Sequence, residues 1–244
     1  MRQPTTAART MPLLCLCLAG CSGLFQSKAK PEQVYYLRAP PAPTVPAVPA
    51  TGPGSASHQA AATAAPAAPA PVSIRVGRPV ADPGLDTPHI LLVQADHRMN
   101  FFSGSRWPAP APELIQALTV QTLRASGEWA SVEDSASPFP SDYLLVAHLR
   151  RFEADYAESD SAPVVHVMLD CIIGRRQGRE VLSTFTVAGS AAASTNHMSQ
   201  VVAAFEQATG TALTALAHQA GQVVRADVER AAQNDDKPLP SISR

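Results

Sequence analysis

The sequence predicts an α+β domain of two layers, in which two helices cover a mostly antiparallel sheet of about five to six strands. After Ser73, apolar residues recur at every second position in several short segments, which is typical of half-buried strands. Apolar residues recur at three- and four-residue steps over about 111–126 and 198–232, which is typical of helices that face a core. The span 73–232 is long enough for one core and too short for two.

The strands before the first helix are indicated by alternation and by turn residues. In SIRVGRPV (73–80), Ile74 and Val76 lie on one face, which predicts a first strand. HILLVQADHRMNFF (89–102) contains two apolar runs joined by a polar turn at 94–98, a pattern typical of a β-hairpin.

The first helix is expected at about 111–126. It follows a proline-rich run, carries Glu113 near its start and stops before Gly127, and these features are common at helix ends. Its apolar stripe consists of Leu114, Ile115, Leu118, Thr122 and Leu123.

Three more strands are predicted in the second half of the chain. Residues 142–156 begin apolar on both faces, as a central strand would. Residues 162–174 alternate, with Cys171 on the apolar face and His166 and Asp170 on the other face. The polar turn RRQGRE leads to the third strand, VLSTFTVAG. Cys171 is therefore expected to be a small buried hydrophobe and not a reactive thiol.

The longest periodic segment, about 198–232, predicts the second helix. Gly210 and Gly221 lower its helix propensity without interrupting the stripe. The stripe consists of Val202, Phe205, Thr209, Leu213, Leu216, Ala220, Val223 and Val224.

The N-terminus has the parts of a secretory signal peptide. Arg2 and Arg9 give a positive start, residues 11–18 are apolar but too short to span a bilayer, and small residues precede Cys21. Leu18-Ala19-Gly20-Cys21 resembles a bacterial lipobox, in which the cysteine receives a diacylglycerol and the preceding peptide is removed.

Residues 1–20 are therefore the predicted signal peptide, and Cys21 is the predicted lipidation site. Several acyl chains on one cysteine satisfy the condition for stable membrane anchoring. Ser22 after the cysteine favours sorting to the outer membrane in lipoproteins of this kind. The alternative is an ordinary secretory signal that is cut after Gly20.

The net charge excludes some classes of partner. The whole chain carries −1, and removal of residues 1–20, with two arginines and no acidic residue, changes this to −3. Neither a nucleic-acid partner nor a polybasic membrane patch is expected.

Two segments flank the predicted domain. Residues 39–72 are dominated by Ala and Pro and contain no charged residue, which indicates a tether. A PxxP ligand for a recognition domain is the alternative. Residues 21–38 contain the acylated N-terminus and a short strand, in which Val34-Tyr35-Tyr36-Leu37 is expected to join the domain as an edge strand. Residues 233–244 are the predicted tail.

No catalytic or metal-binding motif is found. The sequence has no H-x₃-H or HExxH spacing and no G-x-S-x-G elbow, so neither an enzyme nor a cofactor is expected. Glu153, Asp155, Glu158 and Asp160 are close in sequence, but a solvated acidic hairpin tip is favoured over a catalytic carboxylate pair.

Trp107 is the residue singled out as a candidate for partner binding, together with Arg106. A tryptophan at a helix entrance is most often a core residue. The alternative is an exposed anchor that contacts a partner protein.

Several stretches carry a resemblance to a known family. They are YYLRAP after the lipobox, Leu85-Asp86-Thr87-Pro88-His89-Ile90, Arg106-Trp107-Pro108-Ala109-Pro110 and DYLLVAHLRRFEAD. In this order and spacing, the chain from Cys21 to about residue 220 resembles the ABC-type transport auxiliary lipoproteins (PqiC-like). Pro108, Pro110 and the long Ala/Pro segment depart from the family pattern.

The resemblance implies a non-catalytic auxiliary lipoprotein at the outer membrane, in an Mce-type ABC system that transports phospholipid or a related hydrophobic molecule. The implied partners are a periplasmic Mce-domain protein and the ABC permease and ATPase of the same system, and the membrane through the lipid anchor. The oligomeric state stays open, with a homo-oligomer among the alternatives. A structural or assembly lipoprotein and a lipid-binding periplasmic carrier are the other functions considered.

Overall fold

A computed structural model of the chain describes residues 31–40, 70–156 and 162–235. The chain divides into two units, Met1–Glu32 and Gln33–Arg244, and every described helix and strand belongs to the second unit. The predicted signal peptide and Cys21 lie outside the described residues. So do Glu158 and Asp160, and most of the Ala/Pro segment and of the predicted tail.

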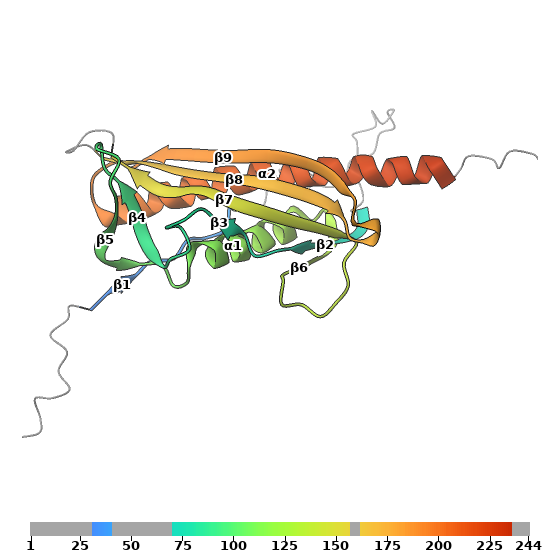
Figure 1. Ribbon diagram of the computed structural model, residues 1–244, viewed down its shortest axis with the longest axis horizontal. Helices are drawn as coiled ribbons and strands as arrows, with labels where there is room; N and C mark the ends of the chain where they lie inside the picture. The colour runs from blue at the N-terminus through green and yellow to red at the C-terminus, as the bar shows by residue number, and fades with distance from the viewer. Residues whose placement is uncertain (1–30, 41–69, 157–161, 236–244) are drawn as a thin grey trace, which may run out of the picture. The chain divides into compact units, whose positions relative to one another are not determined.

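The described ranges form nine strands, two α-helices and one short 3-10 helix, η1 (Figure 1). The predicted α+β class is confirmed, but there are more strands than the predicted five to six. One of the additional strands, β3, has only two residues, which is too short to show a periodic pattern. In chain order the elements are β1 (Gln33–Val34), β2 (Ala70–Val76), β3 (Val80–Ala81), β4 (His89–Val93), β5 (Met99–Arg106), α1 (Ala111–Ser126), β6 (Trp129–Glu133), β7 (Tyr143–Asp155), β8 (Val164–Arg175), η1 (Gln177–Arg179), β9 (Val181–Ala192) and α2 (Met198–Asp235).

The thirteen-residue strand β7 is the centre of the sheet, as its apolar start predicted. One edge of β7 pairs antiparallel with β8, and β8 pairs antiparallel with β9. Along the other edge, β2, β3 and β4 each pair with part of β7, all parallel to it. β4 and β5 are antiparallel, which confirms the predicted hairpin, while β2 pairs parallel with β6 and β5 with β1. The sheet is therefore mixed, and its longest pairings are antiparallel.

The first helix has the bounds predicted from the sequence, Ala111–Ser126. Pro110 stands at the N-cap, and Pro112 lies in the first turn, where an amide has no intrahelical partner to lose. Gly127 ends the helix in the left-handed conformation, with φ 67°, and its N–H donates to the carbonyl of Arg124 at 3.3 Å.

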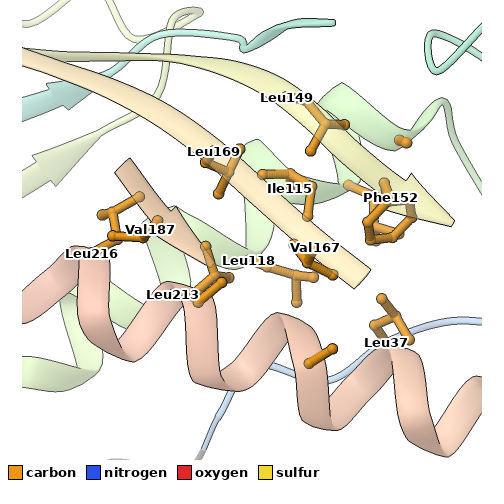
Figure 2. Packing of buried hydrophobic residues seen from close by; sticks show 14 of the residues in the cluster. Leu37, Ile115, Leu118, Leu149, Phe152, Val167, Leu169, Val187, Leu213 and Leu216 are labelled. Atoms are coloured by element: carbon orange, nitrogen blue, oxygen red, sulfur yellow. The ribbon is translucent and has the colours of Figure 1, made fainter. Parts of the chain in front are cut away.

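Both helices cover the same face of the sheet (Figure 1). α1 contacts β6, β2 and α2, while α2 contacts β8 and β9. Gly189 of β9 makes this close approach possible, because a Cβ there would overlap the carbonyl oxygen of Ala208 in α2. Figure 2 shows Leu213 and Leu216 of α2 pointing toward the sheet, in the same cluster as Val187 of β9.

The alternation predicted for β8 is confirmed. Its inward row consists of Val165, Val167, Leu169, Cys171 and Ile173, and each is at most 1% exposed. Cys171 is a free, buried thiol, and burial raises its pKa to about 12. Its role is packing, as expected, because a thiol with so high a pKa carries almost no thiolate at neutral pH.

A β-bulge keeps β7 in phase with the core. Leu149 and Phe152 are both buried although they lie three residues apart, which a regular strand does not permit. The pairing with β8 shifts between Leu149 and Arg151, so the strand accommodates one extra residue at this point.

The N-terminal segment joins the sheet at an edge, as predicted, but its strand covers Gln33–Val34 and not the expected Val34–Leu37. β1 pairs parallel with the end of β5, and the Tyr35 N–H donates to the Arg106 carbonyl at 2.9 Å. Leu37 follows and is 6% exposed, within the main core. Residues 33–40 therefore belong to the same folded unit as β2.

Candidate functional site

A surface depression lies between residues 34–40 and the first half of α2. We call it the N-terminal groove; its volume is about 630 Å³. Its lining consists of Val34, Tyr35, Tyr36, Arg38, Ala39, Pro40, Ser199, Val202, Ala203, Glu206, Gln207 and Gly210.

One wall of the N-terminal groove comes from the segment that follows β1. Burial of Leu37 fixes this segment on the core, so its neighbours Tyr36 and Arg38 point outward. Tyr36 is 62% exposed and Val34 is 50% exposed. Exposed tyrosine and aliphatic side chains beside a groove are typical of protein-binding surfaces.

The other wall is the exposed side of α2. Ala203 and Gly210 leave room between the longer side chains of Glu206 and Gln207. A Cβ added at Gly210 would lie 3.7 Å from Cβ of Pro40, so the helix and the segment approach each other closely there. The groove is thus lined by apolar, tyrosine, serine and amide groups, with one arginine and one glutamate. This composition suits binding of a polypeptide.

Trp107 belongs to the core and does not line the N-terminal groove. Its side chain has no exposed area, and its ring centroid is 5.2 Å from that of Phe205 in a T-shaped arrangement and 5.8 Å from that of Phe152. The interpretation of Trp107 as a core residue therefore agrees with the structure. An exposed anchor at this position is not present in this conformation, because the aromatic ring is enclosed by two others.

Arg106 is half-buried at the end of β5, and its backbone pairs with Val34 of β1. Of the two residues singled out from the sequence, Arg106 is thus paired with a lining residue of the groove, Val34, and Trp107 packs on Phe205 in the core. The sequence did not predict the residues that form the groove surface. It predicted only that the apolar segment 34–37 would join the domain.

The acidic residues near the β7–β8 turn do not form one solvated tip. Glu153 is buried, its two oxygens accepting hydrogen bonds from Arg151 Nε at 2.6 Å and from the Phe152 N–H at 2.7 Å. Asp155 lies 3.3 Å from Arg151. The expectation of a solvated cluster is wrong for Glu153, since Arg151 and a backbone amide compensate its burial.

The sheet face away from the helices carries a polar network at its middle. His148 Nε2 lies 2.7 Å from Asp82, and Arg150 lies 3.3 Å from the same carboxylate. Asp170 accepts a hydrogen bond from the Thr186 hydroxyl at 2.7 Å. His166 and Asp170 are both half-buried and alternate with the inward row of β8, as predicted. Each charged group of this network has a partner within it, which is typical of structural side-chain ladders between strands.

A second ionic network is buried at the other end of α2. The Asp227 carboxylate is 2% exposed and accepts two hydrogen bonds from Arg175 at 2.7 Å and one from the Tyr143 hydroxyl at 2.9 Å. Burial and the hydrogen bond to Asp227 raise the pKa of Tyr143 to about 12. Burial acts to raise the pKa of Asp227, but the bonds from Arg175 and Tyr143 outweigh it and hold the pKa below its ordinary value.

Asp227 connects α2 to the sheet through Tyr143 of β7 and Arg175 of β8. This role was not predicted from the sequence. A signal was present, because Asp227 follows Ala220 and Val224 in the apolar stripe of the helix at the expected spacing. An acidic residue at such a position requires a buried cationic partner.

The described ranges contain no group of three or more His, Cys, Asp or Glu side chains that could hold a metal ion. Neither described helix has the combination of length and apolar character that crossing a membrane requires.

Comparison with known families gives the context for these surfaces. A family model described as an ABC-type transport auxiliary lipoprotein component matches residues 56–217, well over half of the chain. The chain belongs to this family. The resemblance inferred from the sequence is therefore confirmed, and membership implies a lipoprotein of the cell envelope that is associated with an ABC transport system.

Solved structures share the fold. Protein XCC0632 from Xanthomonas campestris, of the DUF330 family, is similar with a TM-score of 0.64 and 23% identity, covering 81% of this chain and 99% of that chain. The crystal structure of an uncharacterized protein gives a TM-score of 0.51 and 12% identity, covering 61% of this chain and 91% of that chain. A comparison with curated proteins gave no match.

Proposed function

We propose that this protein is the outer-membrane lipoprotein of an Mce-type ABC lipid transport system, where it docks the periplasmic Mce-domain component. The observation that carries the proposal is the family match over residues 56–217. Ser22 after the predicted lipidated cysteine supports the outer membrane as the site of anchoring. The proposed cargo is phospholipid or a related hydrophobic molecule, moved with energy from the ATPase of the system.

The proposed role is non-catalytic. The sequence lacks the GxxxxGK[ST] loop that holds nucleotide phosphates, so the energy of transport has to come from another component. The lipoprotein would contribute a fixed position at the membrane and a surface for its partner.

The N-terminal groove is the proposed docking surface, and its proposed occupant is an apolar segment of the Mce-domain protein. Tyr36 and Val34 would supply apolar contact area, while Arg38 and Glu206 on opposite walls would set the orientation of the segment. Trp107 and Arg106 would support this surface without contacting the partner. Purification of the native lipoprotein from cells after chemical crosslinking, with identification of the captured proteins, tests the pairing.

Cys21→Ser is expected to abolish incorporation of a radioactive fatty acid, because the thiol is the only attachment point of the predicted anchor. The variant should leave the membrane fraction or accumulate unprocessed. Metabolic labelling followed by fractionation checks this. Unchanged labelling with unchanged fractionation would contradict the lipobox assignment and the proposed anchoring.

Tyr36→Ala is expected to weaken binding of the Mce-domain partner by roughly tenfold or more, the size of effect found for aromatic residues at the centre of an interface. The change should leave folding intact, because the side chain is 62% exposed. Affinity of the purified pair, measured by surface plasmon resonance, provides the readout.

Phe139→Ala is the matched control for Tyr36→Ala, because Phe139 is an aromatic residue of similar exposure, 67%, that does not line the groove. It should leave the affinity unchanged. Equal affinities for wild type and Tyr36→Ala would show that the N-terminal groove is not part of the interface with the Mce-domain protein.

A further inference from the structure

A second depression lies on the sheet face away from the helices, at the end where β8 turns into β9. We call it the arginine groove; its volume is about 600 Å³. In Figure 1 this turn lies at the opposite end of the sheet from β1. We call its apolar lining residues, Leu144, Val146, Ile172 and Val181, the floor, and its remaining lining residues, Gly174, Arg175, Arg176, Arg179 and Glu180, the rim.

The tight turn between β8 and β9 places the two arginines beside this floor. Gly174 is required there, since a Cβ would overlap the carbonyl oxygen of Glu180 across the hairpin. The register shifts between Ile173 and Gly174, and the Arg175 N–H donates to the Glu180 carbonyl at 2.9 Å. Arg179 itself has a positive φ of 54°, which is uncommon for a residue with a Cβ.

The rim carries three arginines and one carboxylate, that of Glu180, which pairs with Arg175 at 3.1 Å. The other two arginines have no carboxylate partner among the described residues. Arg175 is engaged with Asp227 and Glu180. Arg176 donates to the neutral Ser141 hydroxyl at 3.2 Å, and within the described residues Arg179 has neither an ion pair nor a hydrogen bond. Two guanidinium groups are thus available to bind an anion.

The floor beside this charge is a continuous apolar surface in contact with solvent. Val146 and Ile172 lie opposite each other on β7 and β8 and are 37% and 39% exposed, and Val181 is 65% exposed. Gly77 abuts Val146, with its ideal Cβ position 3.3 Å from the valine Cγ1, and so adds no side chain to obstruct the floor. Hydrated apolar area of this kind is costly, and a ligand with a hydrocarbon part would remove it from water.

We infer that the arginine groove binds one phospholipid molecule, with its phosphodiester on Arg176 and Arg179 and an acyl chain on the apolar floor. Guanidinium groups are well suited to phosphate because several N–H donors can engage the phosphate oxygens at once. The ligand is thus an anionic amphiphile, in which charge and hydrocarbon match the two parts of the groove. The inference deepens the proposed function, on which it depends for the source of the lipid.

The test uses the full chain in its native host, with the cellular phospholipids labelled by radioactive phosphate. A photoreactive benzoylphenylalanine replaces Val181 in the groove, or Phe139 outside it, and the cells are irradiated. We expect a radioactive adduct on the lipoprotein with the probe at 181 and none with the probe at 139. The mass added to the crosslinked peptide identifies a phospholipid and separates it from free phosphate.

Charge variants then test the arginines. Arg176→Gln together with Arg179→Gln should lower the adduct at 181 at least tenfold, because both phosphate contacts are lost. Arg98→Gln, which removes a 71% exposed arginine on the β4–β5 turn, is the control and should leave the yield within about twofold. Resistance of the variants to limited proteolysis, compared with wild type, verifies that they fold.

The possible outcomes separate the inference from the proposed function. No adduct at 181, equal adducts at 181 and 139, or an adduct that survives the double substitution would each overturn the phospholipid site. Equal adducts would indicate general contact with a bilayer. If the Mce-domain protein is still captured in the same cells, the proposed function stands and the lipid site alone is rejected.

Discussion

Trp107→Ala is expected to lower the free energy of unfolding by about 3–5 kcal/mol, the usual cost of truncating a buried tryptophan. The indole has no exposed area and packs on Phe152 and Phe205, so alanine would leave a cavity between β7 and α2. For a domain of this size the melting temperature should fall by on the order of 10 °C, which calorimetry measures directly.

The binding readout decides between the two roles considered for Trp107. Because the residue is buried and does not line the N-terminal groove, partner binding should be lost only in proportion to the unfolded fraction, and it should return on cooling. Phe139→Ala, an exposed aromatic truncation, should shift the melting temperature little. A Trp107→Ala variant that melts like wild type yet does not bind would instead mark Trp107 as a contact residue.

Asp227→Asn is expected to lower the free energy of unfolding by about 3 kcal/mol, the lower end for breaking a buried ion pair. The substitution keeps the shape of the side chain but removes the buried carboxylate partner of Arg175, which retains the exposed carboxylate of Glu180 at 3.1 Å. The loss of stability should stay below the roughly 5 kcal/mol that the most deeply buried ion pairs give. The Arg175 side chain is 35% exposed, and the amide oxygen of Asn can still accept a hydrogen bond. Chemical denaturation at neutral pH measures the difference.

The stability difference between wild type and Asp227→Asn should depend on pH. The pKa of Asp227 is lowered in the folded protein, so the carboxylate stabilises the fold above its unfolded pKa, which is about 4. The contribution is therefore complete at about pH 6 and is lost as the pH falls through the lowered folded value. Denaturation midpoints compared from neutral to acidic pH should converge.

Asp96→Asn is the control for this pH dependence. Asp96 also pairs with an arginine, Arg98, at 2.6 Å, but both side chains are largely exposed. Its removal should leave the denaturation midpoint unchanged at neutral pH. Midpoints of wild type and Asp227→Asn that stay equally far apart down to pH 2 would show that the network does not act through the charge of Asp227.

The parts of the fold that the sequence predicted are those whose signals are local. The bounds of α1 follow from Pro110, Pro112 and Gly127, each of which acts on its own segment of backbone. The inward row of β8 follows from strict alternation over twelve residues. Burial of Cys171 follows from the same pattern.

The features that were missed depend on contacts between distant segments. The bulge after Leu149 is visible only when β7 is paired with β8. The sequence of a single strand gives no signal for the parallel pairing of β2, β3 and β4 with β7. The N-terminal groove likewise needs residues 34–40 and α2 to meet across more than 150 positions of chain, so the sequence indicated an apolar segment without indicating what it would face.

The docking of residues 33–40 on the sheet determines how far the domain could reach from a lipid anchor. Both Pro40 and Ala70 belong to the folded unit, so the number of residues between them does not set the distance from Cys21 to the domain. Twelve positions separate Cys21 from Gln33, and an extended chain of that length spans at most roughly 40 Å. With acyl chains on Cys21, insertions in 22–32 would lengthen the greatest distance between the membrane anchor and the domain. Insertions in 41–69 would leave that distance unchanged.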